Sequence, residues 1–72
     1  MIKWKKLDAG EYESEDGRFY VLKTWNRLYG NHWTIRDRFE EDYYKGLYNE
    51  ETFLQCKLRA EHIINQEEKG VQ

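Results

Sequence analysis

Residues 11–25 read EYESEDGRFYVLKTW, and this stretch decides the fold. The pair Asp16-Gly17 lies between two runs that are rich in aromatic and β-branched residues. An Asp-Gly pair in this setting favours a tight hairpin turn, because both of its residues accept a positive φ. Apolar and polar side chains alternate in both runs, which is typical of antiparallel strands with one face in water. The pattern therefore predicts two strands, over residues 10–15 and 18–25.

A third alternating run, HWTIRD, covers residues 32–37. Gly30 lies in the segment before it, which we expect to form the connecting loop. Residues 2–7 can add a short edge strand at the N-terminus, with Trp4 as its anchor. We therefore expect a three-stranded antiparallel meander, to which this edge strand is a possible addition.

The last third of the chain is expected to form one helix. Asn49 resembles a helix N-cap, and the two glutamates after it suit the positive end of a helix dipole. The helix should cover residues 50–67, and the tyrosine-rich residues 39–48 before it should form an ordered surface loop. The fold class is thus α+β, with a meander sheet packed on one C-terminal helix in a single domain of 72 residues.

The two periodicities also predict which side chains meet in the core. The sheet should contribute one alternating face and the helix one stripe, with Trp4 closing an end. The expected core residues are Tyr12, Phe19, Val21, Trp33 and Ile35 from the sheet and Phe53, Cys56, Ala60, Ile63 and Ile64 from the helix. The other face of the sheet should carry Arg18, Tyr20, Leu22, Thr24, Thr34 and Arg36, open to solvent or to a partner.

Composition excludes several classes of function. The net charge is −2, from 12 basic and 14 acidic side chains, so the chain as a whole has no positive field to attract nucleic acid. We expect no signal peptide and no membrane span, and the lone cysteine fits a reducing compartment, so a cytoplasmic location is expected. Twelve aromatic residues exceed what a small core needs, so several should lie on the surface as contact residues.

The sequence shows no set of residues in a pattern typical of a catalytic site. His32 and His62 lack the spacing of metal ligands, and we expect no metal and no cofactor. Cys56 falls on the core face of the helix and is interpreted as a small buried apolar residue. The carboxylates lie in expected turns, loops and exposed helix positions, where burial would not raise a pKa for general acid catalysis. We therefore expect a protein that is not an enzyme.

Four segments of the chain carry a resemblance: Trp4-Lys5-Lys6-Leu7, Gly10-Glu11-Tyr12, Asp16-Gly17-Arg18-Phe19 and Trp33-Thr34-Ile35-Arg36-Asp37. With the helix that follows, the chain resembles a recurrent kind of short protein found in phages and other mobile elements of bacteria. That resemblance implies a fold and a genomic setting, and hence the cytoplasm of a host cell. The order of three strands and a helix is also similar to the arm-type DNA-binding domains of tyrosine integrases, which lay the open sheet face in the major groove.

The first function hypothesis is a small binding protein of a phage or mobile element. It would modulate or inhibit a host protein by protein–protein contact, for example as a counter-defence protein acting on a host nuclease or a CRISPR complex. The candidate contact residues are Trp25, Tyr29, Tyr43, Tyr44, Tyr48, Leu54 and Leu58.

The alternative is a DNA-binding module that uses the open sheet face. Its candidate residues are Lys3, Lys5, Arg18, Tyr20, Lys23, Arg36 and Arg38. Charge geometry separates the two hypotheses, because Glu11 and Glu13 are out of phase with Tyr12 and should interrupt a basic face. A homodimer, joined through the helix or a sheet edge, is compatible with either hypothesis.

Overall fold

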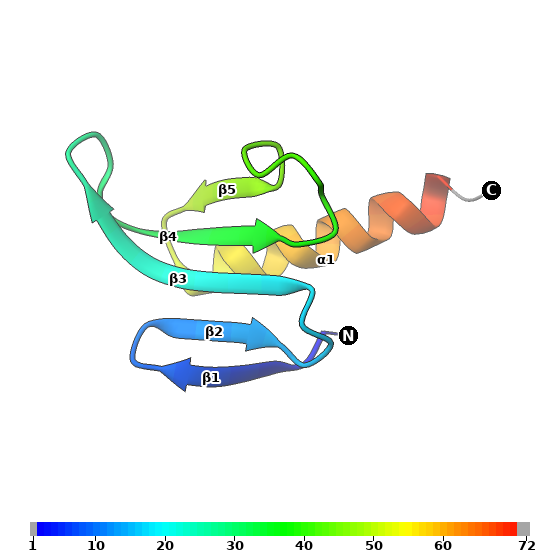
Figure 1. The fold of residues 1–72 in the computed structure, drawn as a ribbon, viewed down its shortest axis with the longest axis horizontal. Coiled ribbons are helices and arrows are strands. Elements are labelled where there is room, and N and C mark those ends of the chain that lie inside the picture. Colours follow the sequence, from blue (N-terminus) through cyan, green and yellow to red (C-terminus); the bar gives the residue numbers. More distant parts are fainter. Residues whose placement is uncertain (1, 71–72) are drawn as a thin grey trace.

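The computed structural model describes residues 2–70 and shows a five-stranded antiparallel sheet with one helix packed across one face (Figure 1). Neighbouring strands in the sheet are also neighbours along the chain, so the sheet is a meander in the order β1-β2-β3-β4-β5. The elements are β1 (Trp4–Asp8), β2 (Glu11–Ser14), β3 (Phe19–Asn26), β4 (Gly30–Asp37), β5 (Leu47–Glu50) and α1 (Phe53–Gly70). The α+β class is confirmed, and so is the N-terminal edge strand.

The prediction of three strands with one possible edge strand missed the fifth strand, β5. This strand has only four residues and pairs with β4, where Tyr48 lies opposite Ile35 and Leu47 opposite Arg36. Its sequence, LYNE, is too short to show an alternation of its own. Pairing with β4 decides its conformation, and local sequence preference does not.

The connection from β4 to β5 is organised around the guanidinium of Arg36. Its Nη2 donates a hydrogen bond to the carbonyl oxygen of Glu40 at 2.7 Å, and its Nη1 donates to the carbonyl oxygen of Asp37. Gly46 is buried against this group, and its carbonyl oxygen accepts a hydrogen bond from the Asp37 N–H at 2.7 Å. The expected surface loop is therefore present, but it ends at Gly46, because the next residues form β5.

The helix begins three residues later than expected, so Asn49 is not its N-cap. Asn49 lies in β5, and Thr52 caps the helix through its Oγ1, which accepts a hydrogen bond from the Gln55 N–H at 3.1 Å. The Gln55 side chain in turn accepts from the backbone N–H groups of Glu51 and Thr52. This reciprocal arrangement is a capping box of the Thr-x-x-Gln type.

The core lies between the helix and the sheet and is built from the predicted residues. Phe19, Val21, Ile35, Cys56 and Ala60 are all 0 % exposed. A partly buried layer surrounds them, in which the ring of Phe53 stacks on Tyr12 with ring centroids 4.1 Å apart and on Trp33 at 5.4 Å. The remaining members of this layer are Ile2, Trp4, Tyr48, Ile63 and Ile64.

Candidate interaction surfaces

The turn between β3 and β4 projects from one end of the molecule (Figure 1). The turn and the end of β3 present three large apolar side chains to solvent: Trp25 in β3 is 62 % exposed, and Leu28 and Tyr29 in the turn are 81 % and 58 % exposed. Arg27, between them, is exposed as well. We call residues 25–29 the hairpin tip. Trp25 and Tyr29 were predicted contact residues, whereas Leu28 and Arg27 were not.

The backbone of the hairpin tip is ordered by hydrogen bonds to the Asn26 side chain. The Asn26 side-chain oxygen accepts from the backbone N–H of Leu28 at 3.0 Å and from that of Tyr29 at 2.7 Å. Gly30 follows with a φ of 67°, which a side chain would disfavour. The ring of Tyr29 also lies 5.5 Å from the imidazole of His32, centroid to centroid. The apolar side chains are therefore displayed on a preorganised turn.

The tyrosines that were predicted as one contact group are separated by the fold. Tyr43 and Tyr44 lie on the β4–β5 connection, are exposed and touch each other edge to face. Tyr43 also covers the guanidinium of Arg36 at 5.1 Å. Tyr48 does not belong with them: it packs against the core, and Arg59 stacks over its ring at 4.8 Å.

Leu54 and Leu58 lie on the helix, and both are more than half exposed. Since Cys56 and Ala60 are buried against the sheet, these leucines occupy the other side of the helix. The predicted separate stripe outside the core is therefore confirmed. It consists of two leucines on a helix whose other exposed side chains are mostly polar.

Acidic side chains interrupt the open face of the sheet. Glu13 pairs with Lys5 at 3.3 Å and also with Arg38, and these two contacts hold the pKa of the Glu13 carboxyl below its usual range. The Tyr20 hydroxyl donates a hydrogen bond to Glu11, which raises the pKa of that phenol. The basic side chains Lys5 and Arg38 of this face are therefore paired with an acidic side chain of the same face. Little unpaired positive charge is left there to contact phosphates.

Arg18 does not lie on the open face, which corrects the expectation from alternation. It precedes β3, and its guanidinium is buried, with Nε 3.0 Å from Asp37 Oδ1 and Nη2 2.6 Å from Glu67 Oε2. Phe39 covers it at 4.4 Å. Arg18 thus ties the ends of β3 and β4 to the helix, and it holds the pKa of the Glu67 carboxyl below its usual range.

The remaining predicted basic contacts do not converge on one surface either. Lys23 is exposed but, within β3, it alternates with the open-face residues and lies opposite Trp33 of the core layer. Lys3 lines a groove beside the helix. Arg36 donates to backbone carbonyl oxygens of its own connection. The predicted nucleic-acid residues are therefore dispersed over at least three parts of the molecule.

Two features of residues 2–70 bear on catalytic chemistry. Burial raises the pKa of the Cys56 thiol to about 12, so the thiolate that a nucleophile requires is suppressed. Within this part of the chain, no three side chains of His, Cys, Asp or Glu gather as a metal site. The helix that the structure describes is not apolar enough to cross a membrane.

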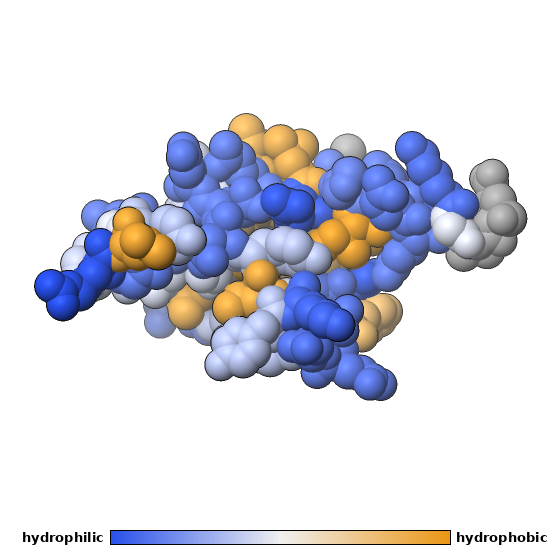
Figure 2. Space-filling view, turned by 90° about the horizontal axis from the view of Figure 1, so that it is seen from above, coloured by the Kyte–Doolittle hydropathy of each residue, from blue (hydrophilic) through white to orange (hydrophobic). Residues whose placement is uncertain are grey.

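The face seen in Figure 2 is mostly hydrophilic, and its apolar atoms form separate small patches. One of these patches lies at the end where Figure 1 places the hairpin tip.

Comparison with known proteins identifies no family: no family model, curated protein or solved structure matches the chain significantly. Function must therefore be argued from the surfaces themselves.

Proposed function

We propose that this chain is a small, non-enzymatic protein-binding module that contacts its partner through the hairpin tip. In keeping with the resemblance to short phage and mobile-element proteins, the partner is a host protein whose activity the module inhibits or modulates. A counter-defence role against a host nuclease or a CRISPR complex is one such activity. The observation that carries the proposal is the exposure of Trp25, Leu28 and Tyr29 around a turn whose backbone is hydrogen-bonded to Asn26.

Exposed apolar side chains on a preorganised turn have a physical advantage in binding. Tryptophan, tyrosine and arginine are the residue types most enriched among energetically dominant contacts, and the hairpin tip holds one of each. Burying a leucine side chain fully contributes about 1.5–3 kcal/mol. Because the turn is already ordered, little conformational entropy is lost on binding.

The DNA-binding alternative has weaker support from the described residues. It requires the open face of the sheet to present contiguous positive charge. Lys5 and Arg38 instead share Glu13, and Arg18 is buried in ion pairs on the other side of the sheet. The protein-binding proposal requires none of these side chains.

A pull-down from host-cell lysate, with and without nuclease, followed by affinity measurement on the purified partner, tests the proposal. Three variants place one aspartate on each of three exposed apolar groups: Leu28→Asp in the hairpin tip, Tyr44→Asp in the β4–β5 connection and Leu58→Asp on the helix. All three side chains are more than half exposed, so each variant should keep the circular dichroism spectrum of the parent. Leu28→Asp should weaken binding about tenfold or more, and the other two should leave the affinity within a factor of about two.

Two results would contradict the proposal. If Leu28→Asp still binds the partner with the parent's affinity, the hairpin tip is not part of the interface. If Tyr44→Asp or Leu58→Asp loses binding in its place, the contact lies at the β4–β5 connection or on the helix. Recovery of nucleic acid, with every protein lost after nuclease treatment, would favour the open face of the sheet and the DNA-binding alternative.

A further inference from the structure

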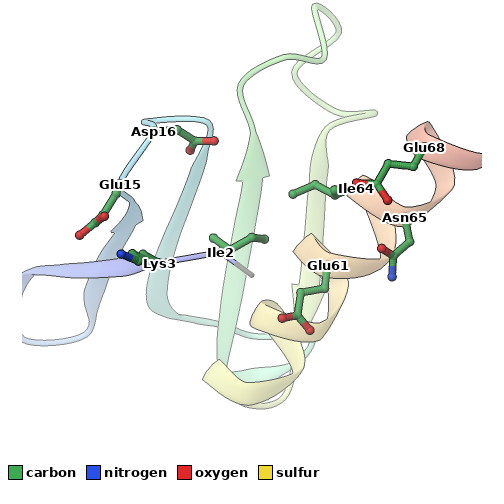
Figure 3. Close-up of a pocket in the computed structure, with 8 residues that line it drawn as sticks. All are labelled: Ile2, Lys3, Glu15, Asp16, Glu61, Ile64, Asn65 and Glu68. Carbon is green, nitrogen blue, oxygen red and sulfur yellow. The ribbon is translucent and has the colours of Figure 1, made fainter. Parts of the chain in front are cut away.

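A groove runs beside the second half of the helix, at the end of the molecule opposite the hairpin tip (Figures 1 and 3). One wall is the helix, the other is the turn between β2 and β3, and the N-terminal segment lies between them. Ile2 and Ile64 face each other in its middle (Figure 3). The full lining is Ile2, Lys3, Glu15, Asp16, Glu61, Ile64, Asn65 and Glu68.

The groove is strongly acidic around an apolar floor. Its lining holds four carboxylates, from Glu15, Asp16, Glu61 and Glu68, against the single ammonium of Lys3. The Ser14 hydroxyl and the backbone N–H of Arg18 donate to Asp16 and hold the pKa of its carboxyl below the usual range, so Asp16 remains charged at neutral pH. A cation in the groove would therefore meet negative charge on both walls.

Of these four carboxylates, the fold uses the one on Asp16, which accepts the hydrogen bonds of the β2–β3 turn. The helix is joined to the sheet by the ion pairs Arg18–Glu67 and Arg59–Glu50, and none of these four residues is part of the groove lining. Within residues 2–70, Glu61 and Glu68 form no ion pair. Repulsion among the like charges opposes folding slightly, and the two isoleucines leave apolar surface in contact with water. A cationic, partly apolar ligand would reduce the repulsion and cover that apolar surface.

We propose that this groove binds a segment of a partner protein in which basic and apolar side chains alternate. From Glu61 to Glu68 the helical wall rises about 10 Å, at about 1.5 Å per residue. An extended chain covers that length with about three residues. The occupant is thus a Lys/Arg–apolar–Lys/Arg segment, whose central side chain packs on Ile2 and Ile64. The two flanking side chains leave the extended backbone on its opposite side, and their long flexible stems bend back over the walls to bring the cations to the carboxylates.

Titration of the isotope-labelled protein with short synthetic peptides, followed by amide resonances, tests the proposal. The probe is acetyl-Gly-Lys-Leu-Lys-Gly-amide, and the reference peptides replace the leucine by serine or both lysines by glutamate. The matched variants are Glu61→Gln/Glu68→Gln in the groove and Glu41→Gln/Glu51→Gln on exposed positions elsewhere, which change the net charge equally.

We expect saturable shifts at residues 61–68 and 15–16 with the Lys-Leu-Lys peptide. The groove variant should bind about fivefold more weakly or worse, and raising NaCl from about 50 to about 200 mM should weaken binding for the parent. The control variant should match the parent within a factor of about two, and the glutamate peptide should not bind.

The proposal is overturned if the groove resonances do not shift, if both double variants bind alike, or if the serine peptide binds as tightly as the leucine peptide. It is also overturned if, without peptide, the protein self-associates in sedimentation with concentration-dependent shifts at the groove resonances, and Leu28→Asp abolishes both. That last result would identify the occupant as the hairpin tip of a second copy.

Discussion

At the scale of single residues, Arg18 is a buried charged side chain that connects three elements of the fold. Its guanidinium bonds both carboxylate oxygens of Asp37 and both of Glu67, and so joins the ends of two strands to the helix. The sequence pattern predicted Arg18 on the open face because Phe19 and Val21 face the core, and side chains in a strand alternate between the two faces. That alternation applies only inside the strand, and Arg18 lies in the turn before it, where the chain can direct its side chain inward.

Arg18→Met should therefore destabilise the fold by about 3–5 kcal/mol, because it leaves the buried Asp37 carboxylate without its partner. Urea unfolding followed by tryptophan fluorescence measures the change. Arg38→Met is the matched control, since it removes an arginine whose side chain is 44 % exposed, and its effect should be much smaller. Equal effects of the two substitutions would show that the buried cluster does not stabilise the fold.

At the scale of elements, the strands and the helix differ in how far their own sequences specify them. The β2–β3 and β3–β4 hairpins were predicted because Asp16-Gly17 and the long alternating runs are local signals. The start of the helix was misassigned because Asn49 is a plausible N-cap in isolation, whereas Thr52 and Gln55 form the actual capping box. β5 could not be predicted, since its four residues are ordered by β4 and by the connection around Arg36.

Gly46→Ala tests how that connection orders β5. An added Cβ would clash with Nη1 of Arg36 and would lie 2.8 Å from the backbone oxygen of Asp37, and the backbone atom cannot easily move. We expect a loss of about 1–3 kcal/mol, typical of overpacking, with faster amide hydrogen exchange confined to residues 47–50. Gly70→Ala is the matched control, because no atom of residues 2–70 outside its immediate neighbours lies within 4 Å of its Cβ position. Unchanged exchange in β5 for Gly46→Ala would mean that pairing with β4 alone holds the strand.

At the scale of the whole molecule, the core was predictable and the surfaces only in part. Periods of two and 3.6 residues determine which side chains face inward, so the predicted core residues were found in place. Trp25 and Tyr29 were identified by residue type, but Leu28 was missed because a leucine gives no sign of exposure until its turn is known. The acidic groove could not be foreseen, since Ile2, Asp16 and Ile64 come together only in the folded chain.

The hairpin tip and the groove lie at opposite ends of a molecule whose longest dimension is 41 Å (Figure 1). β3 runs between them and is paired along its length with β4 and in part with β2. Because coupling between two sites requires an element with two arrangements, we expect this continuously paired strand to transmit no change from one site to the other. Saturating the hairpin tip with its protein partner should therefore leave the Kd of the Lys-Leu-Lys peptide unchanged within a factor of about two. A peptide titration with and without that partner measures this, with the Leu28→Asp variant as the control that cannot be saturated. Displacement of the peptide would mean that one partner spans both ends, and the two surfaces would then form a single interface along β3.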